Sequence, residues 1–306
     1  MTLSRVLGQK VLDGLLHSDP AQRVRWKSLT SARSMLIRLR DPNVRIVLDG
    51  HDLELPLSHD LPLIRREHPG YLTNLGRVAS LVGAKYPEHP AIDIGANVGD
   101  TAVIIRAAAD VPILCIEGDP RFGELLERNL SGVPRVRIER SFVDVSAGTK
   151  RVNIQTSRGT TTLAPDQSGT EVDFTTLSAI VAADPSFAEP ALIKTDLDGW
   201  DGALLSAEAP LLERAKPTLF FEYDPRAAHA ATGRDPTEVF DVLGRVGYTT
   251  LAIYGNTGTY LTGGGPTEEL IRDIHRLCRA SDAGYCDLAA FHSRDEDLFD
   301  LVHARD

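Results

Sequence analysis

The stretch Ala91-Ile-Asp-Ile-Gly-Ala-Asn-Val-Gly-Asp100 decides the fold of this 306-residue chain. Residues 91–95 are typical of a short buried strand, and Gly95 and Gly99 allow a tight turn from that strand into a helix. A dinucleotide-binding turn carries three glycines in the pattern GxGxxG, but here the second and third of these positions are Asn97 and Asp100. Asp100 also places a negative charge at the helix N-terminus, where a phosphate would otherwise bind. The turn therefore disfavours recognition of a pyrophosphate.

Outward from this stretch, short apolar segments alternate with helical ones from Pro90 onward, which is the pattern of a parallel sheet covered on both faces. The predicted strands are 91–95, 113–117, 135–143, 191–196, 218–223, 248–254 and 285–291. Between 149 and 175, a Thr-rich segment around Arg158-Gly159 predicts an inserted hairpin. We expect an α/β fold with a mainly parallel sheet and helices on both of its faces.

The first 85 residues have a different pattern. Apolar residues recur at helical spacing over 3–15, and a second helix is expected from Asp19-Pro20 to just before Asp41-Pro42. Residues 44–48 and 53–57 alternate around Asp49-Gly50, which predicts a β-hairpin. A further helix is expected after Pro69-Gly70. We therefore predict a helical and hairpin cap over 1–85, followed by a ligand-binding domain over 86–306.

Composition narrows the class of protein. Lys and Arg number 33 against 43 Asp and Glu, and the resulting net charge of −10 argues against a nucleic-acid binder. No apolar run approaches the ~20 residues of a membrane span, and the N-terminal segment does not resemble a signal peptide. The three cysteines, Cys115, Cys278 and Cys286, form no CxxC pair, which fits a reducing, cytoplasmic setting.

The carboxylates near the glycine turn suit a ligand with a positive charge and no phosphate, and S-adenosylmethionine (SAM) is such a ligand. Glu117 ends the second predicted strand, 22 residues after Gly95, where an acidic residue can accept hydrogen bonds from a ribose diol. This spacing alone does not separate a methyltransferase from an NAD-dependent oxidoreductase. The predicted cofactor contacts are Asp93, Gly95, Ala96, Asn97, Gly99, Asp100, Glu117 and Asp196.

Three motifs resemble those of the FkbM-type methyltransferases, a family of class I SAM-dependent enzymes. They are Ile92 to Asp100, Ile116-Glu-Gly-Asp-Pro120 followed by Leu126 to Asn129, and Leu192-Ile-Lys-Thr-Asp-Leu-Asp-Gly-Trp-Asp201. The resemblance implies a Rossmann-like class I methyltransferase fold, with a mainly parallel seven-stranded sheet whose last strand is antiparallel, and makes 86–306 a SAM-binding methyltransferase domain. It also implies an O-methyltransferase that acts on a hydroxyl of a sugar, glycan or polyketide-type metabolite. Asp198-Gly-Trp-Asp201 departs from the family's usual Glu-Gly-x-Glu, because each acid is one methylene shorter. A methyltransferase-like binding subunit without activity stays an alternative.

Candidate catalytic groups follow the strands. Asp196 and Asp198 come after the strand at 191–196, and Glu222 and Asp224 end the next one. These carboxylates could act as a general base, hold Mg²⁺ or Ca²⁺, or serve only as helix caps and ion-pair partners.

The cap and a predicted lid loop supply the remaining candidates. A cap that precedes the sheet can fold over its ligand edge, and the lid loop is expected after Asp224. Our predicted catalytic residues are Asp196, Asp198 and His59, and our predicted substrate contacts are His68, Tyr71, Asp224 and His229. The sequence leaves open the metal, the acceptor and whether the chain forms a homodimer.

Overall fold

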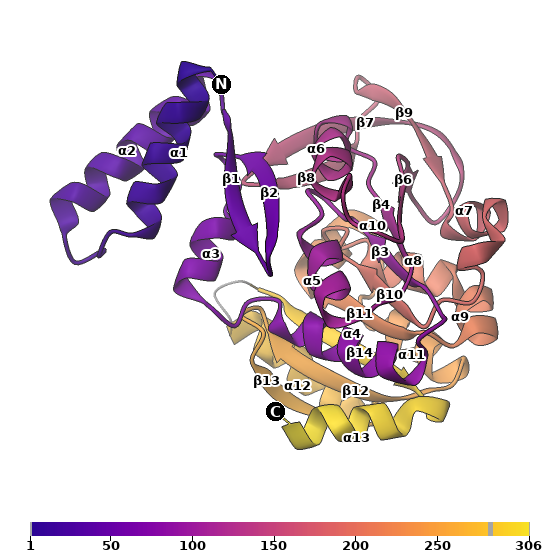
Figure 1. The fold of residues 1–306 in the computed structure, drawn as a ribbon. Coiled ribbons are helices and arrows are strands. Elements are labelled where there is room, and N and C mark those ends of the chain that lie inside the picture. The colour runs from indigo at the N-terminus through magenta and orange to yellow at the C-terminus, as the bar shows by residue number, and fades with distance from the viewer. Residues whose placement is uncertain (1, 281–283, 306) are drawn as a thin grey trace.

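An eight-stranded mixed sheet forms the centre of the molecule in our computed structural model, which describes residues 2–280 and 284–305 (Figure 1). In order across the sheet, its strands are β13 (Tyr260–Gly264), β12 (Tyr248–Gly255), β14 (Cys286–His292), β11 (Thr218–Tyr223), β10 (Leu192–Thr195), β3 (Ala91–Ile94), β4 (Ile113–Ile116) and β5 (Val136–Glu139). Strands β11, β10, β3, β4 and β5 pair in parallel, whereas β14 is antiparallel to both of its neighbours. This sheet has the parallel centre and the antiparallel strand that the sequence resemblance led us to expect.

The predicted sheet is confirmed, with one strand more than expected. Strand β13 adds to the edge of the sheet by pairing antiparallel with β12. The single strand predicted over 135–143 is wrong. Strand β5 ends at Glu139, residues 140–141 belong to neither strand, and β6 (Phe142–Val143) then joins a second sheet. The chain therefore leaves the central sheet after Glu139.

Helices cover both faces of the sheet, as the alternation of strands and helices predicted. One face packs against α4 (Thr73–Lys85), α5 (Asp100–Ala108), α6 (Pro120–Leu130) and α13 (Glu296–Arg305). The other packs against α7 (Leu177–Ala183), α8 (Asp201–Ala207), α9 (Ala209–Ala215), α11 (Glu238–Arg245) and α12 (Glu268–Ala280). Residues of β3 alternate between the two cores, since Ile92 and Ile94 enter one and Ala91 enters the other. None of the helices described is both long enough and apolar enough to cross a bilayer.

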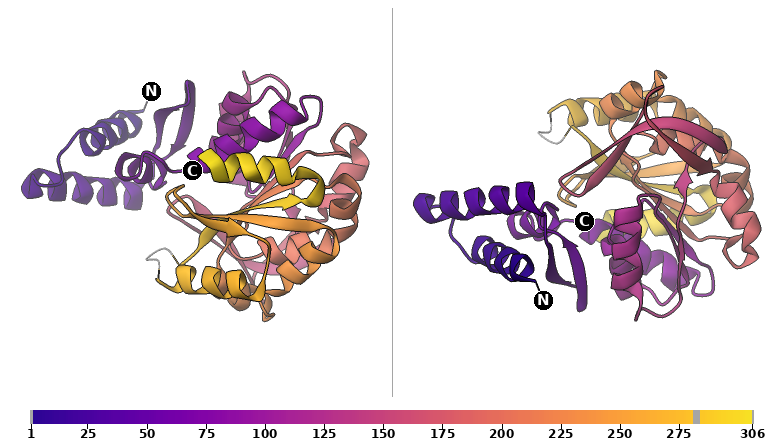
Figure 2. Two further views of the ribbon diagram at one scale, coloured as in Figure 1. Left: turned by 90° about the horizontal axis from the view of Figure 1, so that it is seen from below. Right: turned by 90° about the horizontal axis from the view of Figure 1, so that it is seen from above.

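The N-terminal part consists of α1 (Leu3–Leu16), α2 (Arg23–Leu39), the hairpin β1 (Asn43–Leu48) and β2 (His51–Pro56), and α3 (Leu61–Glu67). Its buried apolar side chains form one small core together with Val98, Phe122 and Leu125 of the sheet domain. The predicted hairpin is confirmed, and Asp49 and Gly50 both have the positive φ that its tight turn requires. Helix α4 lies in the helical layer against α5, whereas α1 and α2 stand apart from the sheet in every view (Figures 1 and 2).

A second sheet is inserted between β5 and α7, which we call the inserted sheet. It contains β6, β9 (Thr170–Thr175), β7 (Gly148–Ser157) and β8 (Thr160–Pro165), in that order. The predicted hairpin is present as β7 and β8, with Arg158-Gly159 at its turn, and β9 was not expected. The loop predicted after Asp224 is wrong, because residues 225–232 form helix α10 (Pro225–Thr232) with Asp224 as its N-cap. Two short 3₁₀ helices, Pro185–Phe187 and Ser293–Asp295, complete the described elements.

Candidate functional site

A cavity of about 330 Å³ lies at the carboxyl ends of β3, β4 and β10, and we call it the edge cavity. It is lined by the turns after these strands, by α3 with the loop before it, and by the inserted sheet. Open α/β sheets bind their ligands at this edge, and the volume lies in the range of small-molecule sites. The edge cavity is therefore the candidate site.

The turn after β3 has a backbone that only particular residues permit. Gly95 and Gly99 have φ values of +73° and +92°, and a Cβ at position 95 would lie 2.2 Å from the carbonyl oxygen of Asp196. Asn97 also has a positive φ, of 51°. Gly95 and Asn97 line the edge cavity, whereas Ala96 is completely buried and Gly99 caps α5. Two of the four turn residues that we predicted as cofactor contacts therefore line the cavity.

Glu117 lies where the sequence placed it, at the end of β4 and on the wall of the edge cavity. Its Oε2 accepts a hydrogen bond from the backbone N–H of Asn97 at 2.9 Å, and its Oε1 accepts one from the N–H of Asp119 at 2.7 Å. Burial raises the pKa of Glu117 to about 7. Each oxygen accepts only one of these bonds, so the carboxylate retains capacity to accept from a ligand.

Asp93 does not line the cavity, although we predicted it as a cofactor contact. Its carboxylate is fully buried, accepts a hydrogen bond from Thr101 Oγ1 at 2.6 Å, and lies 3.1 Å from the Nζ of Lys194. Lys194 does reach the cavity, and its Nζ also donates to the carbonyl of Gly95 at 3.1 Å. Although burial alone would lower the pKa of Lys194, its carboxylate neighbours, Asp93 first, raise it above the usual value. Asp93 therefore positions a buried cation beside the glycine turn.

Besides Glu117, three carboxylates from the predicted motifs line the edge cavity: Asp100, Asp196 and Asp198. Burial raises the pKa of Asp100 to about 6 and that of Asp198 to about 7. The Asp196 side chain is half exposed, with its Oδ2 4.0 Å from the Nζ of Lys194. Asp201 stabilises the turn after β10, because its buried carboxylate accepts hydrogen bonds from Thr195 Oγ1 and from the N–H of Leu197. Among the described residues, no three His, Cys, Asp or Glu side chains form a group that could hold a metal ion.

The cap contributes two of its three predicted residues. His59 and Tyr71 line the edge cavity, whereas His68 is exposed on the surface and does not. The Nδ1 of His59 accepts a hydrogen bond from the N–H of Leu61 at 3.2 Å, and burial lowers the pKa of His59 to about 4. The neutral ring therefore carries its proton on Nε2. Burial raises the pKa of Tyr71 above its usual value.

Asp224 and His229 lie outside the edge cavity. Asp224 caps α10 by accepting from the N–H groups of Arg226 and Ala227. His229 is exposed on α10, with its Nδ1 3.1 Å from the carbonyl oxygen of Arg234. Glu222 and Asp224 border a separate, smaller hollow beside α8 and α10. Because 225–232 is a helix, it holds His229 away from the edge cavity and forms no lid.

The inserted sheet was the part of the site that sequence reasoning missed. The Nδ2 of Asn97 donates to the carbonyl of Gly159 at 2.6 Å, and the N–H of Asp60 donates to the carbonyl of Arg158 at 3.1 Å. Thr161 Oγ1 also donates to Asp119 at 2.7 Å. These bonds hold the turn between β7 and β8 over the cavity. The sequence identified this turn but carried no signal that would place it here.

The neighbouring segment after β5 was missed as well. Ser141 and Phe142 line the edge cavity next to Gly118, where an added Cβ would lie 2.3 Å from the Phe142 ring. Gly118 is therefore needed for the close approach of the two segments.

Comparison with known proteins gives likenesses among solved structures alone. No protein-family model matches the chain, and no curated protein matches it. A methyltransferase FkbM from Methylobacillus flagellatus is 15% identical over 67% of this chain, with a TM-score of 0.43; this chain covers 44% of its length. A TehB-like SAM-dependent methyltransferase from Corynebacterium glutamicum is 13% identical over 71% of this chain and 86% of its own, with a TM-score of 0.37. The fibrillarin pre-rRNA processing protein of Methanococcus jannaschii is 10% identical over 67% of this chain and 66% of its own, also with a TM-score of 0.37.

Proposed function

We propose that the chain is a SAM-dependent methyltransferase that methylates a hydroxyl group of its acceptor. The observation that carries this proposal is that one cavity combines the open glycine turn, Glu117 and the carboxylates of Asp100, Asp196 and Asp198. The turn is unsuited to phosphate, because the N–H of Asn97 is already bound by a carboxylate and Asp100 stands at the start of α5. A cationic ligand with a ribose is favoured over a dinucleotide.

The polar groups at the cavity fit such a ligand. Asn97 Oδ1 and His59 Nε2 are buried at the edge cavity and face each other, since Asn97 counters part of the effect of burial on the His59 pKa, but they form no hydrogen bond of normal geometry. A ligand with donors and acceptors would satisfy them. When bound, SAM would supply an electrophilic methyl group on a sulfonium. Glu117 would accept from its ribose, and Asp100 and Asp196 would lie near its positive charges.

The residues of the cavity can also prepare a hydroxyl for attack. Asp198 is a suitable general base, because a carboxyl with a pKa of about 7 both ionises and accepts a proton near neutral pH. Asp196 would orient the hydroxyl beside it. His59 presents an N–H rather than a lone pair to the cavity, so we assign it to binding and not to proton removal. Tyr71 would enclose the acceptor from the cap side.

Isothermal calorimetry on the full chain tests the cofactor. We expect SAM and S-adenosylhomocysteine to bind and NAD to show no heat. Glu117→Gln should weaken binding about tenfold or more, because a hydrogen bond to a charged acceptor contributes roughly 1.5–3 kcal/mol. The matched control Glu124→Gln changes an exposed acid on α6 outside the cavity and should leave the dissociation constant unchanged. Binding of NAD without SAM would overturn the proposal in favour of an oxidoreductase.

A second experiment tests the reaction. The chain is incubated with SAM carrying a deuterated methyl group and with sugars, oligosaccharides and polyketide alcohols, and the products are read by mass spectrometry. We expect a labelled product that survives mild alkali, since a methyl ether resists hydrolysis and a methyl ester does not. Tight SAM binding with no labelled product from any acceptor would instead support a binding subunit without activity.

A further inference from the structure

Helix α2 carries a concentration of positive charge on an acidic protein. Residues 23–40 contain five Arg and one Lys, and they contain no Asp or Glu. Over residues 1–42, eight Lys and Arg face three Asp, so the rest of the chain has a net charge of −15. Because opposite charges are separated between the N-terminal helices and the body, the molecule has a strong electrostatic polarity. A negatively charged surface would attract the α2 end and repel the other.

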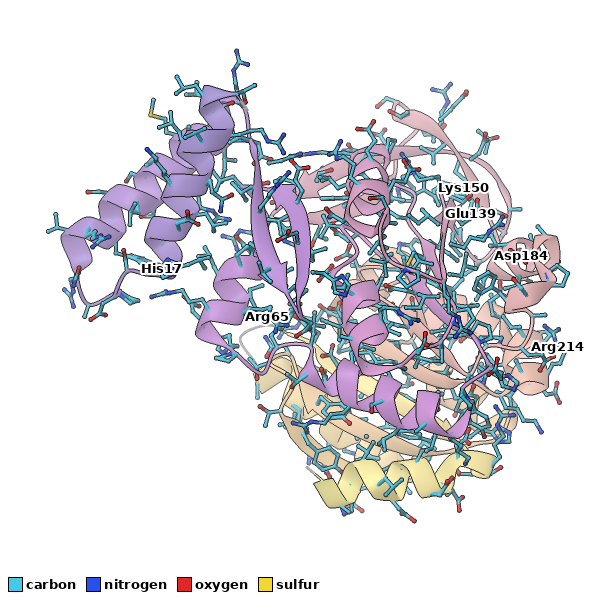
Figure 3. All side chains as sticks on the ribbon, in the orientation of Figure 1. His17, Arg65, Glu139, Lys150, Asp184 and Arg214 are labelled. Atoms are coloured by element: carbon cyan, nitrogen blue, oxygen red, sulfur yellow. The ribbon has the colours of Figure 1, made fainter. Side chains whose placement is uncertain are left out.

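The same helix exposes apolar side chains. No residue of α2 is buried, and Val24, Met35 and Leu39 are 82%, 64% and 64% exposed. At 3.6 residues per turn these three share one side of the helix with Ser28 and Ser31. The hydroxyl of Ser28 donates a hydrogen bond to the carbonyl of Val24 at 2.9 Å, so this hydroxyl already has a partner within the helix. Figure 3 shows side chains on the outer sides of α1 and α2 that project away from the rest of the molecule.

One cation of α2 is used inside the protein, and the others are not. Arg33 donates to the carbonyl of Leu57 at 3.0 Å and pairs with Asp60 at 2.8 Å, which fixes α2 to the segment between β2 and α3. Within the described part of the chain, no ion pair involves the remaining basic residues, Arg23, Arg25, Lys27, Arg38 and Arg40. The outward side of α2 therefore combines unpaired cations with an apolar stripe.

We propose that α2 binds the surface of an anionic lipid bilayer, lying in its plane. Val24, Met35 and Leu39 enter the boundary between headgroups and acyl chains, and the unpaired cations Arg23, Arg25, Lys27 and Arg38 meet the lipid phosphates. The acidic body faces away from the bilayer because like charges repel. A nucleic-acid backbone would match the cations but offers nothing to the apolar stripe. A second copy of the chain would present its acidic body, which leaves the same stripe uncovered.

The test is cosedimentation of the full chain with vesicles of phosphatidylcholine, with or without phosphatidylglycerol, at low salt. We expect binding to the mixed vesicles, little binding to the neutral ones, and release by added salt. Arg23→Gln with Arg25→Gln should lower the partition coefficient about 25-fold, since each cation near an anionic surface contributes ~1 kcal/mol. Met35→Ser with Leu39→Ser should lower it about tenfold. All variants should keep the circular dichroism spectrum and the SAM affinity of the parent chain.

A control separates local contact from net charge. Arg245→Gln with Arg272→Gln removes two exposed cations from α11 and α12 and should leave vesicle binding unchanged. An equal loss in this control, or equal binding to neutral vesicles, would overturn the proposal. So would absence of vesicle binding together with a dimer in analytical ultracentrifugation that the α2 variants abolish. Salt-sensitive binding of duplex DNA in place of vesicles would also overturn it. None of these readouts depends on methyl transfer.

Discussion

Replacing Lys194 by Met should destabilise the protein severely, because it leaves a buried carboxylate without its cation. The Lys194 side chain is 5% exposed and that of Asp93 is fully buried, with 3.1 Å between Nζ and Oδ1. Breaking a buried ion pair by removing one partner typically costs 3–5 kcal/mol. The folded variant can remove this buried negative charge only by binding a proton at Asp93, which at pH 7 costs roughly 4 kcal/mol. We therefore expect the unfolding free energy to fall by ~3–4 kcal/mol at pH 7.

Urea denaturation of the ligand-free chain, followed by circular dichroism at several pH values, measures this loss. The deficit of Lys194→Met should shrink as the pH falls from 7 towards 5, because the folded variant takes up the proton more readily than the unfolded chain. The double variant Asp93→Asn with Lys194→Met should recover most of the lost stability, since neither charge remains. Lys27→Met, on exposed α2, is the matched control and should change little. A deficit below ~1 kcal/mol, or a double variant no more stable than the single one, would refute this reasoning.

Four further predictions concern the edge cavity and its surroundings. Asp198→Asn should lower methyl transfer about 10²- to 10⁴-fold with little change in SAM affinity. Asp196→Asn should lower both methyl transfer and SAM affinity, because Asp196 would also lie near the positive charges of the cofactor. If these carboxylates act without a metal, EDTA should leave turnover intact, and a loss that Mg²⁺ restores would assign them to metal binding instead. Burial raises the pKa of Glu117, Asp198 and Asp287 to about 7, so the folded chain binds protons more tightly than the unfolded chain. The unfolding free energy of the ligand-free protein should therefore rise by ~1 kcal/mol per carboxyl as the pH is lowered from 8 to 6. SAM affinity should fall over the same range. Thermal melts and calorimetry check both signs. Gly159→Ala should cost ~1–2 kcal/mol and speed SAM release in stopped-flow experiments, because φ is +99° and the new Cβ would lie 2.6 Å from the His59 ring.

The central strands could be predicted because their signals are local. The strands β3, β4 and β10 are short and fully buried, and a glycine or an acidic turn follows each of them. The break between β5 and β6 was missed because residues 140–141 contain no glycine or proline to mark it. Helix α10 was missed although Asp224-Pro225 is the same helix-start signal as Asp119-Pro120, where α6 begins. Strand β13 was missed because it runs into three consecutive glycines, Gly263 to Gly265, and because it forms only by pairing with β12.

Part of the candidate site could likewise be predicted from local signals, and part could not. Glu117, Asp100 and Asp196 were predictable because a parallel sheet brings the ends of its strands to one edge. The position of Arg158-Gly159 over the cavity depends on hydrogen bonds from Asn97 and Asp60, which lie 60 to 100 residues earlier in the chain. Lys194 was identified only as part of a motif, but its role depends on Asp93 beside it on the neighbouring strand β3. Contacts between distant segments have no local pattern from which sequence reasoning could recover them.

The contact between Gly95 and the carbonyl of Asp196 acts as a spacer between two halves of the site. Because an added Cβ would lie only 2.2 Å from that oxygen, the cofactor turn and the acidic turn meet backbone to backbone, with no side chain that could be lengthened or shortened between them. Substitution cannot therefore move one turn away from the other without breaking the sheet edge. The cap and the inserted sheet have no such constraint, since they reach the cavity through side chains and a hairpin turn. Attempts to engineer new acceptors should accordingly vary His59, Tyr71 and the β7–β8 turn, and keep residues 95 and 196–198 fixed.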